Sequence, residues 1–320
     1  MDKLYTSLGL MSGTSMDGVD ASIIKSDGMH IYSVLFDKFY PYNTELYSEL
    51  YSIRDKILNE KDLTTHSEQI KIIERKITIF HANIINKIHE ENNINVDFIG
   101  FHGQTIFHSG KNKISKQLGD GNLLSQLTKK IIIYDFRQND IKNGGQGAPL
   151  APIFHKLITE NQKIKLPVCI LNIGGISNAT IVSNLNDDGI ISKDLGPGNC
   201  LIDEWMRKNK KGNYDNNGIY AELGKTNHLM LNHALDIFDN KIDRTNSTYD
   251  IKDFDINFLR GISVEDGAST LTEFTAKIII TELIDFFLKH NVKINNIFLC
   301  GGGRKNSSLL NNLKKNLSNN

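Results

Sequence analysis

The sequence has 320 residues, 39% hydrophobic and 23% charged, a composition typical of soluble globular proteins. Its 37 Lys and Arg residues balance 37 Asp and Glu residues, and this formal charge of zero argues against nucleic acid or an anionic membrane as a partner. Three scattered cysteines, no secretory signal and no apolar stretch long enough to span a membrane predict a cytoplasmic protein without a membrane segment.

Hydrophobic periodicity divides the chain into alternating strands and helices. Apolar runs bounded by glycine or polar residues predict strands, and apolar residues at three- and four-residue spacing predict helices. In chain order, the predicted strands are Leu4–Leu10, Val19–Ile24, Tyr32–Phe39, Val96–Phe101, Ile131–Tyr134, Val168–Leu171, Ile190–Lys193 and Ile297–Cys300. The predicted helices are Thr44–Leu58, Ser67–Glu90, Cys200–Arg207, Leu271–Leu288 and Ser307–Leu317. This alternation favours the α/β class.

The loop between the first two predicted strands has the composition of a phosphate-binding site. Its segment Gly9–Asp20 contains three glycines, which let the backbone turn and approach an anion closely, and three hydroxyl side chains. Asp17 and Asp20 add carboxylates that suit a cation or its water shell. The alternative is an ordinary polar hairpin turn.

A second glycine hairpin, Asn172–Thr180, lies about half the chain away. No Walker A loop occurs, and no Gly-x-Gly-x-x-Gly follows a strand, so neither common nucleotide fingerprint applies. Alone, the second hairpin is explained equally well as a common turn. Two such hairpins from similar sheets, however, can grip a polyphosphate from both sides. Polar or glycine residues come directly after several of the predicted strands. We therefore expect the loops that follow these strands to converge on one crevice.

The chain resembles the anhydro-N-acetylmuramic acid kinases, members of the actin, sugar-kinase and Hsp70 ATPase superfamily. The resemblance runs from Gly9 to about Leu310. It implies two actin-like ATPase domains facing across a nucleotide and sugar cleft, which we place at residues 1–140 and 141–320. The segments that carry it are Gly9–Asp20, Phe101–Thr105, Asp135–Arg137, Gly144–Leu150, Asn172–Asn178, Asp194–Asn199 and Cys300–Gly303.

The resemblance implies a kinase of peptidoglycan recycling that uses ATP and Mg²⁺. ATP and water would convert a small-molecule sugar, 1,6-anhydro-N-acetylmuramic acid, to N-acetylmuramic acid 6-phosphate, with hydrolysis of the anhydro bridge. Asp17 is the expected Mg²⁺ ligand. The residues expected to bind ATP are Gly13, Thr14, Ser15, Met16, Asp17, Gly18, Val19, Asp20, Gly174, Gly175, Gly301, Gly302 and Gly303.

Asp194 matches the general base of the family, the carboxylate that activates water. Its context supports this role, because Ile190–Lys193 is predicted as a strand and Gly196–Gly198 as a rigid turn before a helix. A carboxylate at that point is expected to face the crevice. The alternative is an Asp that stabilises the turn through its own backbone.

Three further residues are expected to bind the sugar. His102 and Gln104 follow a strand end and suit hydrogen bonds to sugar hydroxyls or to the amide. Arg137 offers a planar guanidinium that suits the lactyl carboxylate. For His102 the alternative to sugar binding is a structural role. For Arg137 the alternative is an ion pair with Asp135 or Asp140.

Two other functions remain open from the sequence. Members of the family continue past the segment that matches Ser307–Leu317, with acidic residues on a further helix, whereas this chain stops at Asn320. One alternative is therefore a shortened, inactive homologue that binds nucleotide or sugar. The other is a conventional sugar kinase that phosphorylates a free hydroxyl. Whether the chain forms a homodimer is also open.

Overall fold

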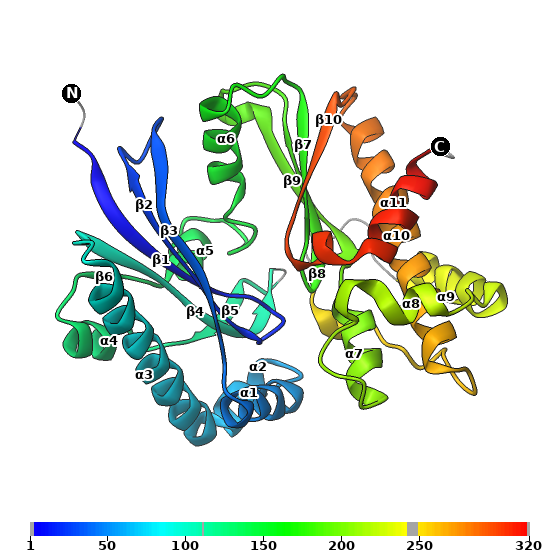
Figure 1. Ribbon diagram of the computed structural model, residues 1–320, viewed down its shortest axis with the longest axis horizontal. Helices are drawn as coiled ribbons and strands as arrows, with labels where there is room; N and C mark the ends of the chain where they lie inside the picture. The colour runs from blue at the N-terminus through cyan, green and yellow to red at the C-terminus, as the bar shows by residue number, and fades with distance from the viewer. Residues whose placement is uncertain (1–2, 111, 242–248, 319–320) are drawn as a thin grey trace. The chain divides into compact units, whose positions relative to one another are not determined.

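The computed structural model describes residues 3–110, 112–241 and 249–318, which form two units, Met1–Leu150 and Ala151–Asn320 (Figure 1). The first unit contains β1 (Tyr5–Ser12), β2 (Gly18–Ser26), β3 (Tyr32–Pro41), α1 (Thr44–Lys56), α2 (Glu60–Thr65), α3 (Ser67–Asn92), β4 (Phe98–Ser109), β5 (Ile114–Leu118), α4 (Gly121–Thr128), β6 (Ile132–Ile133) and α5 (Phe136–Lys142). The second contains α6 (Pro152–Asn161), β7 (Val168–Ile173), β8 (Ile176–Val182), η1 (Asp187–Gly189), β9 (Ile190–Pro197), α7 (Cys200–Lys208), η2 (Asn216–Gly218), α8 (Ile219–Leu223), α9 (His228–Lys241), η3 (Ile251–Asp253), α10 (Val264–Lys289), β10 (Asn296–Cys300), η4 (Gly302–Lys305) and α11 (Ser307–Ser318).

The first unit is built on a sheet with the strand order β3-β2-β1-β4-β5, and β6 also pairs with β4. The first three strands are antiparallel neighbours, whereas β4 runs parallel to β1. Helix α3 begins at Ser67, as predicted, and its isoleucines at three- and four-residue spacing are buried. The Asn43 side chain caps α1 by accepting a hydrogen bond from the Leu46 backbone N–H.

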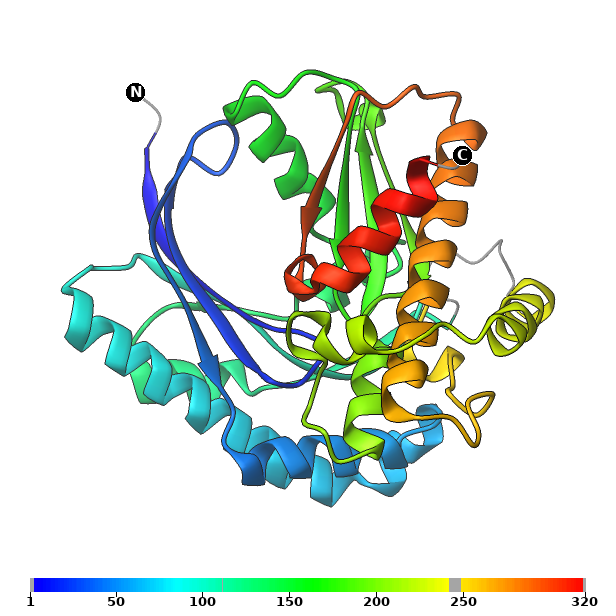
Figure 2. The same cartoon turned by 45° about the vertical axis from the view of Figure 1, so that its right-hand side comes forward.

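The second unit is built on a four-stranded sheet with the order β10-β7-β8-β9. Here β7, β8 and β9 are antiparallel neighbours, and β10 runs parallel to β7. Helix α6 lies on one face of the sheet, and α10 and α11 lie on the opposite face (Figures 1 and 2). A partly buried ion pair ties α10 to β9, since Lys193 Nζ lies 2.7 Å from Oε2 of the buried Glu282.

Both units therefore repeat one order of elements: three antiparallel strands, helices, and a strand parallel to the first. The α/β class is confirmed, and the repeat is the one that the resemblance to actin-like ATPases implies. The predicted strand Ile190–Lys193 is too short, because β9 continues to Pro197. The predicted helix Leu271–Leu288 also begins too late, since Ser263 caps α10 by accepting a hydrogen bond from the Asp266 N–H.

The first unit extends beyond the domain boundary that we expect at residue 140. Helix α5 runs to Lys142, and the loop after it is tied back to Asp140. The Gly145 N–H donates to the Asp140 backbone carbonyl at 2.9 Å, and the Gly147 N–H donates to its carboxylate at 2.7 Å. These bonds hold the glycine-rich segment against the first unit, so the division falls after Leu150.

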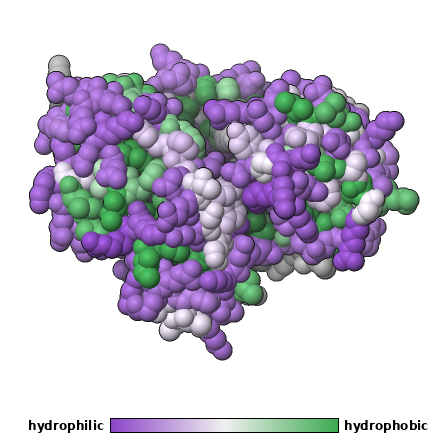
Figure 3. Space-filling model, turned by 60° about the horizontal axis from the view of Figure 1, so that its bottom comes forward, coloured by the Kyte–Doolittle hydropathy of each residue, from purple (hydrophilic) through white to green (hydrophobic). Residues whose placement is uncertain are grey.

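The surface drawn in Figure 3 is mostly hydrophilic, with hydrophobic side chains in separate patches between the polar ones. Across the parts of the chain that the structure describes, no helix combines the length and the apolar character needed to cross a membrane.

Candidate active site

The first glycine hairpin is a loop of five residues between the end of β1 at Ser12 and the start of β2 at Gly18. Met16 adopts a φ of +54°, its N–H donates to the Gly13 carbonyl at 3.2 Å, and its side chain is buried. Of the eight residues predicted to bind ATP in this loop and the start of β2, Thr14, Asp17 and Asp20 are exposed, whereas Met16 and Val19 are buried and apolar and reach a ligand only through their backbones.

Three carbonyl groups of this loop accept hydrogen bonds from outside it. Gln104 Nε2 donates to the Gly13 carbonyl at 2.9 Å, the Tyr51 hydroxyl donates to that of Ser15 at 3.0 Å, and the Tyr42 N–H donates to that of Asp17 at 2.9 Å. Across a trans peptide, a carbonyl and the next N–H point in opposite directions. The Thr14 N–H is therefore directed away from Gln104, an arrangement that suits backbone N–H groups to an anion.

A buried hydrogen-bond chain supports the end of β1. His81 Nδ1 lies 2.8 Å from the Ile77 carbonyl, which can only accept, so Nδ1 carries the hydrogen and Nε2 is the acceptor. The Ser12 hydroxyl lies 3.4 Å from that Nε2 and 2.9 Å from the Tyr42 hydroxyl. Complete burial lowers the pKa of His81 to about 4, which keeps the ring neutral.

Gln104 is fully buried beside the loop between β1 and β2. Its Nε2 holds the Gly13 carbonyl, and its buried Oε1 accepts no hydrogen bond from the residues that the structure describes. The structure thus brings this predicted sugar ligand to Gly13, a predicted ATP ligand of the same unit. The sequence shows that Gln104 follows a strand, but it does not show that this residue meets Gly13, which lies 91 positions away.

His102 and Arg137, the other two predicted sugar ligands, are in direct contact. Arg137 Nε donates to His102 Nε2 at 3.0 Å, and Arg137 Nη1 donates to the Gly147 carbonyl at 3.4 Å. His102 Nδ1 lies 2.7 Å from the Gly103 carbonyl. Burial, followed by the neighbouring Arg137 charge, lowers the pKa of His102 to about 4. The imidazole is therefore neutral near pH 7.

In the second unit, Gly174 and Gly175 form the turn between β7 and β8. Their carbonyls accept hydrogen bonds from the segment that follows β9. Asn199 N–H donates to Gly174 at 2.7 Å, and the N–H groups of Gly198 and Cys200 donate to Gly175 at 2.9 and 3.2 Å. A Cβ at Gly198 would collide with the Gly174 carbonyl, so this approach requires glycine.

The glycine run Gly301–Gly303 follows β10 and lies against the end of β7. Gly301 has a φ of +81°, and a Cβ there would collide with Asn172 and the Ile173 carbonyl. A Cβ at Gly303 would collide with the Ile173 side chain, whereas a Cβ at Gly302 would meet only Asn199 Nδ2, at 3.9 Å. The second hairpin and the glycine run, predicted separately as ATP ligands, thus meet at one end of the second sheet.

Asp194 lies within β9, where it pairs in register with Asn178 of β8. The residue is 9% exposed, and its Oδ2 accepts a hydrogen bond of 2.9 Å from the Tyr249 N–H. The alternative of an Asp bonded to its own turn does not describe this contact, because Tyr249 is 55 positions away. Tyr249 is a residue that sequence reasoning missed, since nothing in the polar segment around it indicates a partner for β9.

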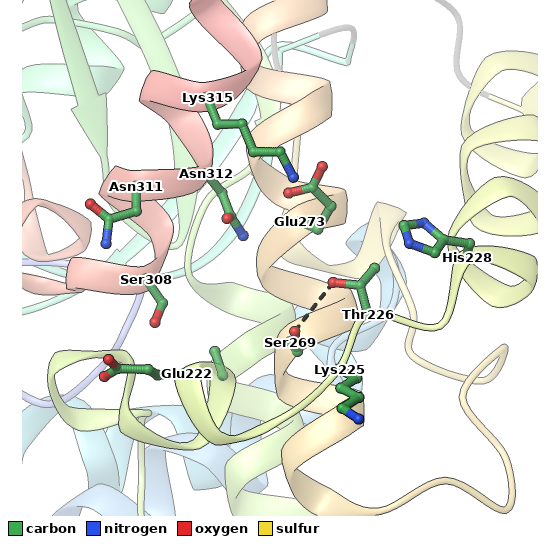
Figure 4. A pocket seen from close by; sticks show the side chains of 11 residues that line it. Glu222, Lys225, Thr226, His228, Ser269, Glu273, Ser308, Asn311, Asn312 and Lys315 are labelled. Atoms are coloured by element: carbon green, nitrogen blue, oxygen red, sulfur yellow. Dashed lines mark hydrogen bonds between the residues drawn. The ribbon is translucent and has the colours of Figure 1, made fainter.

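A concave region of about 550 Å³ in the second unit lies between α8, α10 and α11. It contains none of the predicted site residues. Figure 4 shows polar side chains of both charges around it, with Lys315 and Glu273 pointing toward each other. Thr226 and Ser269 join two of its walls through a hydrogen bond of 3.2 Å. With its charges balanced in this way, the region gives no indication of a ligand.

The family model described as anhydro-N-acetylmuramic acid kinase matches residues 5–320. A relative of that name from Pelagibacter ubique (strain HTCC1062) is 54% identical over 320 residues, which cover 100% of this chain and 85% of the relative. Another, from Gluconobacter oxydans (strain 621H), is 33% identical over 318 residues, covering 98% of this chain and 85% of the relative. Among solved structures, the activator of the 2-hydroxyisocaproyl-CoA dehydratase from Clostridium difficile with bound ADPNP aligns with a TM-score of 0.41 and 9% identity, over 99% of this chain and 86% of that one.

Proposed function

Because the chain belongs to the anhydro-N-acetylmuramic acid kinase family, we propose that it is an ATP-dependent carbohydrate kinase of cell-wall recycling. It converts 1,6-anhydro-N-acetylmuramic acid, water and ATP to N-acetylmuramic acid 6-phosphate and ADP. The observation that carries this function is the 54% identity to a relative of that name over the whole chain. We place the reaction in the cytoplasm, where ATP is available and thiols such as Cys169 and Cys200 stay reduced.

A coupled ADP-release assay tests this function directly. We expect ADP release to depend on the anhydro sugar, and we expect ring-open N-acetylmuramic acid to give little or no release. Equal release with both sugars would indicate a conventional sugar kinase. Binding of ATP and sugar without any turnover would indicate an inactive homologue.

We propose that the ATP phosphates meet backbone N–H groups of Gly13–Asp20 in the first unit and of Gly174–Gly175 in the second. The support is of the same kind in both places, because carbonyl groups of each turn are held by other groups of the protein, which directs the N–H of the next residue, such as Thr14, away from those groups. For the adenosine we propose Gly301–Gly303, where Gly302 is exposed and a Cβ would meet no atom closer than 3.9 Å.

We propose Asp194 as the general base. Water attacks the anomeric carbon and gives a proton to this carboxylate, the bond from that carbon to O6 breaks, and O6 accepts the γ-phosphoryl group of ATP. Two features support the role: Asp194 is largely buried, and the Tyr249 N–H fixes one carboxylate oxygen. A carboxylate held in this way is oriented before the sugar binds, which general base catalysis requires.

Mg²⁺ is the cation we propose for this reaction, with Asp17 as its protein ligand. Mg²⁺ is usually held by one or two carboxylates together with substrate phosphates and water. The exposed Asp17 suits that pattern, and the Ser15 hydroxyl donates to its Oδ1 at 2.6 Å. Within the described residues no three His, Cys, Asp or Glu side chains gather as an all-protein metal site would need. When bound, Mg²⁺ would neutralise charge on the phosphates.

Replacing Asp17 with Asn is expected to damage Mg²⁺-dependent turnover more than ATP binding. The amide keeps the shape of the carboxylate and its bond to Ser15 but loses the negative charge that attracts the cation. The Mg²⁺ concentration for half-maximal turnover should rise roughly tenfold. A tenfold change corresponds to about 1.4 kcal/mol, which is the scale of one lost contact with a charged group. The matched control is Asp37→Asn, an exposed strand Asp that accepts from Ser22 in the same unit. A Mg²⁺ dependence equal to that of the parent would contradict the role of Asp17.

A further inference from the structure

We infer that His102 is a positioning residue, which orients the Arg137 guanidinium toward the sugar carboxylate without contacting the sugar itself. The inference rests on the proposed function and on the prediction, made from the sequence, that Arg137 binds the lactyl carboxylate. It changes the role of His102, which the sequence predicts as a direct sugar ligand.

Both ring nitrogens of His102 are engaged within the first unit. The Gly103 carbonyl 2.7 Å from Nδ1 can only accept, so Nδ1 carries the ring hydrogen. Arginine has only donors, so Nε2, which lies 3.0 Å from Arg137 Nε, is the acceptor. A neutral imidazole has one donor and one acceptor, and here each has a partner. None is left for a sugar hydroxyl or acetamido group.

The neutral state of His102 agrees with this assignment. The ring is half-buried, and burial together with the adjacent positive charge lowers its pKa to about 4. A second proton would have to sit on Nε2, directly against the Arg137 Nε–H. The imidazole therefore accepts from Arg137 over the whole neutral pH range.

Contacts from two elements then fix the guanidinium of Arg137. His102 on β4 accepts from Nε, and the Gly147 carbonyl in the loop after α5 accepts from Nη1. An arginine side chain carries rotamer freedom that is lost when it binds a ligand, and ordering such a side chain beforehand reduces that loss. A fixed plane also suits bidentate binding of a carboxylate. His102 is thus placed to strengthen sugar binding through Arg137.

The test compares His102→Asn with His102→Gln. Asn places its amide near the position of Nδ1 and removes the acceptor that His102 offers to Arg137 Nε, whereas the longer Gln brings a carbonyl oxygen near the position of Nε2. We expect His102→Asn to raise the KM for anhydro-N-acetylmuramic acid roughly tenfold, the scale for ordering one such side chain, with the KM for ATP changed less than about twofold. His102→Gln should recover most of the loss. His89→Asn, at an exposed position of α3, controls for the substitution itself.

A second sugar separates positioning from contact. Anhydro-N-acetylglucosamine lacks the lactyl group, so its KM should respond much less to His102→Asn. Arg137→Lys should also raise the KM for the lactyl sugar, and the double variant should be no worse than Arg137→Lys alone, because His102 acts through Arg137. An equal effect of His102→Asn on both sugars, or additive effects of the two substitutions, would overturn the inference.

Nitrogen NMR of the unmodified protein provides a test that needs no variant. With ¹⁵N-labelled histidine, the His102 ring should show a protonated Nδ1 and an unprotonated Nε2, both without and with bound sugar. A change of tautomer or protonation on sugar binding would overturn the inference. Failure of the proposed function is distinguishable, because the parent protein would then show no ADP release with the anhydro sugar at all.

Discussion

Replacing Asp194 with Asn is expected to lower turnover by ~10²-fold or more, because a general base usually contributes that much to the rate. Folding and ATP binding should remain as in the parent. The amide nearly matches the carboxylate in shape and keeps an oxygen to accept from the Tyr249 N–H. It cannot take the proton of the attacking water. Turnover is measured by coupled ADP release, ATP affinity by calorimetric titration, and folding by the thermal unfolding midpoint.

The matched control is Asp236→Asn, which makes the same change at an exposed position of α9 in the same unit. We expect this control to be as active as the parent. A fully active Asp194→Asn protein would reduce Asp194 to a structural residue of β9. If both variants lost activity equally, the loss would come from the change in net charge and not from a missing base.

An isotope experiment identifies the bond that the activated water forms. In ¹⁸O-water, the parent enzyme should place the label on the anomeric carbon of the product and leave the phosphate unlabelled. Label in the phosphate would mean that water attacks ATP, and the protein would then be an ATPase of this fold. The measurement is mass spectrometry of the product, with the phosphate released and analysed separately.

The sequence predicts the elements of this fold well where one periodic signal dominates. Helix α3 is predicted because its isoleucines repeat at helical spacing, and they are buried. Strand β9 is predicted too short because Asp194, Gly196 and Pro197 are poor strand residues. Pairing with β8 extends the strand through them, and the irregularity in register between Ser177 and Asn178 accommodates the extension.

Part of the candidate site can also be predicted from a local sequence signal. Glycines that follow strands are visible in the sequence, and those of the second unit do meet at the end of β7. Partners that are distant in the sequence are not visible, because only tertiary packing brings Tyr51 to Ser15 or Tyr249 to Asp194. The same limit applies to His102. Its place after a strand suggests a ligand, and only the contact with Arg137 indicates that both of its nitrogens are occupied.

The phosphate loop offers the other large effect, since Gly13→Val is expected to weaken ATP binding by roughly 10- to 100-fold. Hydrogen bonds to charged groups contribute about 1.5–3 kcal/mol, and a branched side chain at this position would keep the phosphate away from the loop N–H groups. The protein itself has room for the change, because a Cβ at Gly13 would come no closer than 3.5 Å to its nearest neighbour, Ser15 Oγ. The loss should therefore appear in ATP affinity and not in folding.

Calorimetric titration with ATP measures this loss, and Gly9→Val is the matched control. Gly9 lies in β1, is exposed, and would place a Cβ 3.8 Å from the Ser22 carbonyl, so valine is accommodated there as well. We expect the Gly9 variant to bind ATP as the parent does. If a folded Gly13→Val protein bound ATP with unchanged affinity, the first hairpin would be a turn that only joins β1 to β2. The bonds from Gln104 and Tyr51 would then stabilise the loop without presenting it to a phosphate.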